Sequence, residues 1–142
     1  MNKLILMCLF VSMTSNVVGQ SHGVFGKWKT IDDETGEVKS IVEIYEKNGK
    51  YYGKVIQIMN KARQDAKCDK CTGSKKNKPV LGLEIIVDMK KDDDEFTGGK
   101  ILDPESGKEY KCNISFETKN KLKVRGYIGF SLIGRTQYWH KI

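Results

Sequence analysis

The stretch Tyr110-Lys111-Cys112-Asn113-Ile114-Ser115-Phe116 decides the fold class of this chain. Apolar or aromatic residues alternate in it with polar ones, and a period of two is typical of a β-strand with one buried face. We therefore predict that every second side chain of this stretch points into a core and that the side chains between them face water.

The same alternation recurs in residues 83–89 and 121–126. We expect Ile86 to face outward with its polar neighbours, because it falls between two inward positions. The predicted inner face comprises Leu83, Ile85, Val87, Tyr110, Cys112, Ile114, Phe116, Leu122 and Val124.

Turn residues such as Lys47-Asn48-Gly49 and Asp103-Pro104-Glu105-Ser106-Gly107 separate the alternating runs. The predicted strands lie near residues 25–31, 39–47, 50–59, 83–90, 95–102, 108–117, 121–128 and 131–141. Short hairpins favour an up-and-down meander, and eight strands suffice to close a barrel around side chains or one small ligand. The sequence therefore predicts an all-β fold: an eight-stranded antiparallel up-and-down barrel with one long basic loop.

The first residues have a different character. Lys3 precedes an apolar run over residues 4–13, and small residues follow at 17–19, which is the order of a secretory signal peptide. A buried N-terminal helix or a membrane anchor are the alternatives, but the apolar run is too short to span a bilayer. We predict a signal peptide over residues 1–19, one β-barrel domain over residues 20–142, and export to the periplasm or the medium without a membrane-spanning segment.

The predicted long loop, residues 60–82, carries most of the positive charge. It contains seven basic and two acidic residues, which is a net charge of +5. The whole chain has a net charge of +7, or +6 once the signal peptide with Lys3 is removed. Such a focus attracts anions, for example lipid headgroups at the envelope surface or an anionic ligand that enters the barrel. A solvated, mobile loop is the alternative. Nucleic acid is a poor partner, because no aromatic residues are interleaved with these lysines.

Three cysteines remain after the predicted cleavage: Cys68, Cys71 and Cys112. In an oxidising compartment we expect one disulfide, either between Cys68 and Cys71 or from one of them to Cys112, with one thiol left over. A redox site would need the first cysteine at a helix N-terminus, which this context does not offer. A zinc site would need a fourth ligand, for which His140 is the candidate, so we predict no metal.

No catalytic arrangement is recognisable. The acidic clusters at residues 32–34 and 92–95 fall in predicted turns, where they have a simple structural role, and residues 129–132 lack the pattern of a nucleophile elbow. We expect neither enzymatic activity nor a cofactor.

Several motifs together resemble the bacterial domain-of-unknown-function family 2147. They are Gly26-Lys27-Trp28, Gly98-Gly99-Lys100-Ile101-Leu102-Asp103-Pro104, Leu122-Lys123-Val124-Arg125-Gly126-Tyr127-Ile128-Gly129 and Gly134-Arg135-Thr136-Gln137-Tyr138-Trp139. The resemblance implies an exported bacterial protein and brings no established activity.

A looser resemblance is to the calycin barrels, which include the lipocalins. These begin with a Gly-x-Trp strand and place an arginine of the last strand against that tryptophan, positions that Gly26, Trp28 and Arg135 match here. The resemblance implies that Arg135 lies over the Trp28 ring and closes the barrel floor.

Our leading hypothesis is a cell-envelope protein that binds a small apolar or anionic amphipathic ligand. Tyr110 and Phe116 would contact its apolar part, and Lys75, Lys76 and Lys78 at the mouth would meet its headgroup. The alternative is an envelope interaction or stress-protection module with a fully packed barrel; an enzyme of unrecognised type is a third hypothesis. The volume inside the barrel distinguishes the first two.

Overall fold

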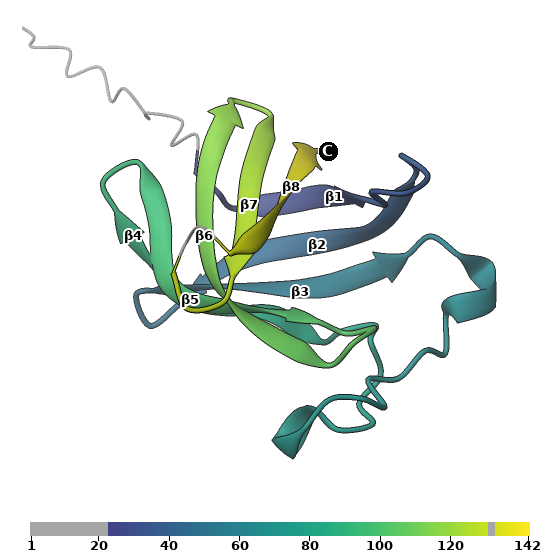
Figure 1. Ribbon diagram of the computed structural model, residues 1–142. Helices are drawn as coiled ribbons and strands as arrows, with labels where there is room; N and C mark the ends of the chain where they lie inside the picture. The colour runs from purple at the N-terminus through teal and green to yellow at the C-terminus, as the bar shows by residue number, and fades with distance from the viewer. Residues whose placement is uncertain (1–22, 131–132) are drawn as a thin grey trace, which may run out of the picture.

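The computed structural model describes residues 23–130 and 133–142. The predicted signal peptide therefore lies outside the described residues, as do residues 131 and 132 at the start of the last predicted strand. The strands are β1 (Gly26–Ile31), β2 (Val38–Lys47), β3 (Lys50–Ile58), β4 (Glu84–Asp92), β5 (Glu95–Asp103), β6 (Lys108–Thr118), β7 (Lys121–Tyr127) and β8 (Gly134–Lys141). Each pairs antiparallel with the next, and β8 pairs with β1 (Figure 1). The predicted closed up-and-down barrel is confirmed.

The two ends of the barrel differ in their connections. At one end the hairpins β2–β3, β4–β5 and β6–β7 turn within two residues each. Asn48 and Gly49, with φ of 53° and 78°, show the left-handed backbone that such tight turns require. The other end, which we call the mouth, carries the longer connections 32–37, 59–83, 104–107 and 128–133.

The inner face of β6 and β7 matches the prediction. Cys112, Ile114, Leu122 and Val124 are buried, and the partly buried Phe116 packs against the same core. Alternation is reliable here because β6 and β7 stay in register over their full inward-facing stretch, from Lys111↔Tyr127 to Phe116↔Leu122.

The prediction for β4 is wrong at two positions. Ile86, expected to face outward, is fully buried, whereas Val87, expected inside, is only partly buried. The β3–β4 register shifts twice, Asp88 adopts a φ of 57°, and Gly98 on the neighbouring β5 has a φ of 77°. These bulges insert extra residues into the alternation, so that Met89 is buried again after two residues that are not. A side chain at Gly99 would collide with the carbonyl oxygen of Val87, so this close approach of β4 and β5 needs glycine.

The long connection between β3 and β4 has structure of its own (Figure 1). It contains two 3-10 helices, Lys61–Arg63 and Gly73–Lys75, and an isolated bridge between Lys67 and Pro79. A disulfide joins Cys68 to Cys71, with 5.2 Å between their Cα atoms, and both cysteines are buried. The predicted disulfide is thus confirmed in its local form, and Cys112 is the free cysteine among the described residues.

This connection docks on the turn between β5 and β6. The Cys68 Sγ atom lies 3.5 Å from the carbonyl oxygen of Pro104, and the Lys70 carbonyl lies against Gly107. In the part of the chain that the structure describes, no helix is long and apolar enough to cross a membrane.

Candidate functional site

The half of the barrel next to the mouth encloses a cavity of about 870 Å³, which opens at the mouth. Small-molecule sites typically measure about 300–1,000 Å³. Its wall is mostly apolar, and the buried or partly buried side chains that line it come from different strands around the barrel. They include Val55, Ile85, Leu102, Tyr110, Val124 and Trp139.

The cavity exists because inward positions change in size along the barrel. Near the mouth the inner face includes small residues such as Thr30, Ser40 and Gly126. At the opposite end large side chains meet, including Trp28 and Met89, which are fully buried. The barrel is thus packed at its closed end, the floor, and hollow between the floor and the mouth.

Trp28 forms the centre of this floor. Its indole nitrogen donates a hydrogen bond to the carbonyl oxygen of Val24 at 2.8 Å, and its ring lies 6.3 Å from that of Phe116. Phe116 was predicted to contact the ligand. It fills the floor instead and does not line the cavity. Tyr110, in contrast, lines the cavity as predicted.

The cation over Trp28 is Lys141 and not Arg135. The Lys141 ammonium lies 4.7 Å from the ring centroid, and the two residues are register partners between β1 and β8. Arg135 lies six residues earlier on β8, at the mouth, where it pairs with Asp33. The predicted Trp28–Arg135 contact is therefore wrong, because the length of β8 separates the two ends of the barrel.

The cavity wall also contains polar groups. The Thr30 and Ser40 hydroxyl groups lie 2.7 Å apart and bind each other. Gln137 projects from β8, and its Oε1 accepts a hydrogen bond from the Trp139 indole at 3.4 Å. We had not singled out Thr30, Ser40 or Gln137. For Gln137 the signal was present, because Arg135, Gln137 and Trp139 alternate on one face of the last strand.

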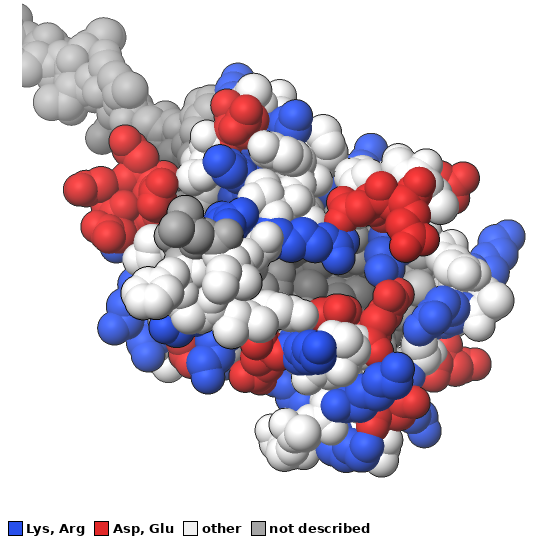
Figure 2. Space-filling model, in the orientation of Figure 1, with Lys and Arg blue, Asp and Glu red and all other residues white. Residues whose placement is uncertain are grey.

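The rim of the mouth carries both charges. Asp32, Glu37, Asp103 and Glu105 line it together with Lys39, Arg63 and Arg135. Lys39 pairs with Glu105 at 2.9 Å, and Figure 2 shows basic and acidic side chains around the hollow on this face. Backbone N–H groups of Thr35 and Glu34 donate to the Asp32 carboxylate and lower its pKa, which matches the turn role expected for this acidic cluster. The rim is therefore mixed in charge.

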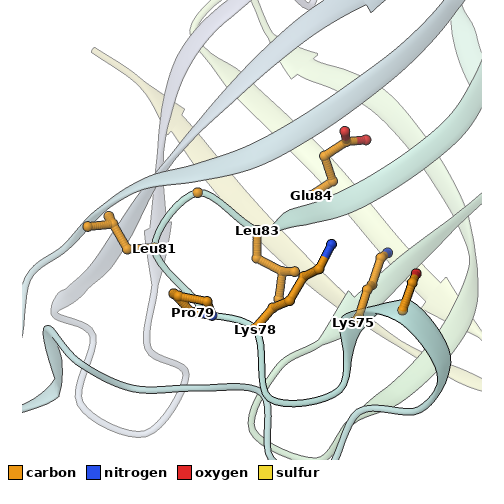
Figure 3. Close-up of a pocket in the computed structure, with 8 residues that line it drawn as sticks. Lys75, Lys78, Pro79, Leu81, Leu83 and Glu84 are labelled. Carbon is orange, nitrogen blue, oxygen red and sulfur yellow. The ribbon is translucent and has the colours of Figure 1, made fainter.

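The lysines that we predicted at the mouth lie elsewhere. Lys75 and Lys78 border a separate pocket of about 390 Å³ beside the start of β4 (Figure 3). Lys76 donates a hydrogen bond to the carbonyl oxygen of Asp69 within the connection. Docking of the connection on the β5–β6 turn carries these residues away from the cavity; Arg63, earlier in the connection, does line it.

Residues 26–141 match the sequence profile of a family described as "Uncharacterized protein conserved in bacteria (DUF2147)". The chain belongs to this family. A search of curated proteins found no match. Among solved structures, protein HP1028 from Helicobacter pylori, described as belonging to the lipocalin family, superposes with a TM-score of 0.74. It is 22% identical, and the match covers 84% of this chain and 83% of that one.

At this identity the likeness concerns the fold: this DUF2147 member has a lipocalin-like barrel. Both resemblances expected from the sequence are thereby confirmed, although the cation over Trp28 differs from the expected arginine. Within the described residues of this DUF2147 chain, no group of three or more His, Cys, Asp or Glu side chains is arranged to hold a metal ion.

Proposed function

We propose that this protein is exported and binds a small apolar or amphipathic molecule inside its barrel. The observation that carries the proposal is the cavity of about 870 Å³, whose wall is mostly apolar and whose mouth is open. Burial of a methylene group contributes about 0.8 kcal/mol, so a flexible apolar chain of moderate length would bind without specific polar contacts. The similarity to a lipocalin-family barrel supports the same function.

The packed-barrel alternative requires that inward side chains meet in the middle along the whole barrel. They do so around Trp28, but the inner face near the mouth, including Thr30 and Ser40, lines a cavity instead. Export rests on the sequence of residues 1–19, and mass spectrometry of protein from an envelope fraction should find a chain that begins at residue 20.

Calorimetry with lipid-stripped protein tests the binding. We expect affinity for a series of straight-chain fatty alcohols to rise with chain length until the chain fills the cavity, after which it should level off. Ile58→Trp, which adds bulk to a residue of the cavity wall, should weaken binding at least ten-fold.

Ile56→Trp is the matched control. Ile56 is on the same strand but outside the set of described residues that line the cavity, so this variant should bind normally. Absence of measurable binding for every chain length would contradict the proposed function, as would equal losses in the two variants when both melt like the wild type.

A further inference from the structure

Three inward positions of β8 form a ladder from the cavity to the mouth: Trp139, Gln137 and Arg135. Trp139 is buried, and its indole nitrogen can only donate a hydrogen bond. It donates to Gln137 Oε1 at 3.4 Å, and this contact orients the Gln137 amide. The NH₂ group of Gln137 consequently points away from Trp139, toward the mouth.

A carboxylate already lies at the mouth end of this row of three residues, next to Arg135. Asp33, from the β1–β2 connection, accepts a hydrogen bond from the Arg135 guanidinium. The same Asp33 oxygen lies 3.5 Å from the Gln137 amide nitrogen. Two donors from β8 thus converge on one carboxylate oxygen at the edge of an apolar cavity.

The Asp33–Arg135 pair is accessible and replaceable. The Asp33 side chain is 44% exposed and that of Arg135 is 67% exposed, and ion pairs with this exposure contribute only about 0–1 kcal/mol to stability. Moving Asp33 away would return its carboxylate to water and leave the Arg135 and Gln137 donors facing the cavity rim. A second carboxylate would restore the same hydrogen bonds, while its attached apolar chain would gain burial in the cavity.

We propose that Arg135 and Gln137 form a carboxylate-binding site for the headgroup of an amphiphilic acid, and that Asp33 occupies this site until the ligand displaces it. The inference rests on the proposed function, because the tail of the acid must lie in the barrel cavity. Asp33 acts as an internal competitor that lowers the affinity for acids and leaves the affinity for neutral amphiphiles unchanged. The headgroup site is therefore on β8 and not on Lys75, Lys76 and Lys78.

A double-mutant cycle tests this competition, with dodecanoic acid, dodecanol and dodecyl phosphate as probes at pH 8. Asp33→Asn should tighten the binding of dodecanoate by about two- to five-fold, which is the range that displacement of an exposed ion pair allows. It should change the affinity for dodecanol by less than two-fold. Adding Arg135→Gln to Asp33→Asn should abolish the gain, whereas adding Arg63→Gln, the same charge change elsewhere on the rim, should preserve it.

Several outcomes would overturn the site. One is an Asp33→Asn variant with unchanged dodecanoate affinity or with an equal gain for dodecanol. Equal gains for dodecyl phosphate would replace the carboxylate site with a general anion site. Loss of the gain with Arg63→Gln would show that the rim acts through total charge. Failure of all three probes to bind any variant would refute the proposed function itself. Melting curves verify that each variant is folded.

Discussion

The two tryptophans show how single residues set the function of each half of the barrel. Trp28 closes the floor, with its indole nitrogen bonded to the Val24 carbonyl and Lys141 over its ring at 4.7 Å. Partial burial disfavours the charged form of Lys141 and lowers its pKa. The Trp28 ring and the Phe25 carbonyl oxygen stabilise the charged ammonium group in return. Trp139 instead contributes to the cavity wall and orients Gln137. Buried indole nitrogens thus anchor the floor and direct a polar group toward the mouth.

Cys112 offers a prediction at the same scale. It is 1% exposed, and burial raises the pKa of its thiol to about 12. In the folded protein at pH 8 the thiol stays protonated and out of reach, so a thiol reagent should not modify it over minutes. In denaturant without reductant, thiol counting on the cleaved chain should find one reactive cysteine, because Cys68 and Cys71 are joined. Rapid modification of the native protein would contradict the burial of Cys112.

At the scale of elements, the β3–β4 connection is a docked segment and not a free loop. Backbone hydrogen bonds from Cys68 to Lys78 at 2.8 Å and from Val80 to Ala66 at 2.9 Å tie its two arms together. The disulfide closes a loop of a few residues, for which chain entropy alone gives about 2 kcal/mol. These contacts place Arg63 on the rim of the mouth and keep Lys75 and Lys78 outside it.

Gly107 tests whether docking stabilises this segment. It has a φ of 71°, and a side chain there would overlap the Lys70 carbonyl. Gly36, with a φ of 72° and open space around it, is the matched control. Both Ala variants carry the left-handed strain of about 1–2 kcal/mol. Gly107→Ala should lose more stability than Gly36→Ala and should accelerate hydrogen exchange in residues 66–80. Equal losses and equal exchange would show that docking contributes nothing.

At the scale of the whole molecule, the closure between β1 and β8 is the weakest joint of the barrel. Within the described residues these strands share two register pairs, Trp28↔Lys141 and Lys29↔His140, whereas β7 and β8 share seven. Nearer the mouth, the Asp33 and Arg135 side chains bridge this seam. Thr30 and Ile31 on one side and Arg135 and Gln137 on the other line the cavity, so the seam is part of the site wall.

Hydrogen exchange should reveal this asymmetry. Amides of β1 and of the mouth half of β8 should exchange faster than those of β6, because local opening needs fewer hydrogen bonds to break there. A bound amphiphile should slow exchange on both sides of the seam more than in the β2–β3 hairpin at the closed end. Equal protection of β1, β6 and β8 would indicate a uniformly closed wall.

The sequence by itself determined the strands, their antiparallel order and most of the inner face. Alternation and tight turns are local properties, and strands joined by short hairpins have few ways to pair other than with their neighbours. The sequence also predicted one disulfide and one free thiol, since three cysteines in an oxidising compartment leave one unpaired, but it left all three possible pairings open. Tyr110 was placed in the cavity by the alternation of β6 alone.

Only the tertiary structure decided where the site lies and what surrounds it. The bulge at Asp88 reverses the face of Ile86 and Val87, and such a shift depends on how β4 meets its neighbours. The position of Lys75, Lys76 and Lys78 follows from docking between segments 36 residues apart along the chain, and the Lys141–Trp28 contact joins the two ends of the fold. Whether the inward side chains meet or leave a cavity depends on their sizes around all eight strands at each level, which no local pattern contains.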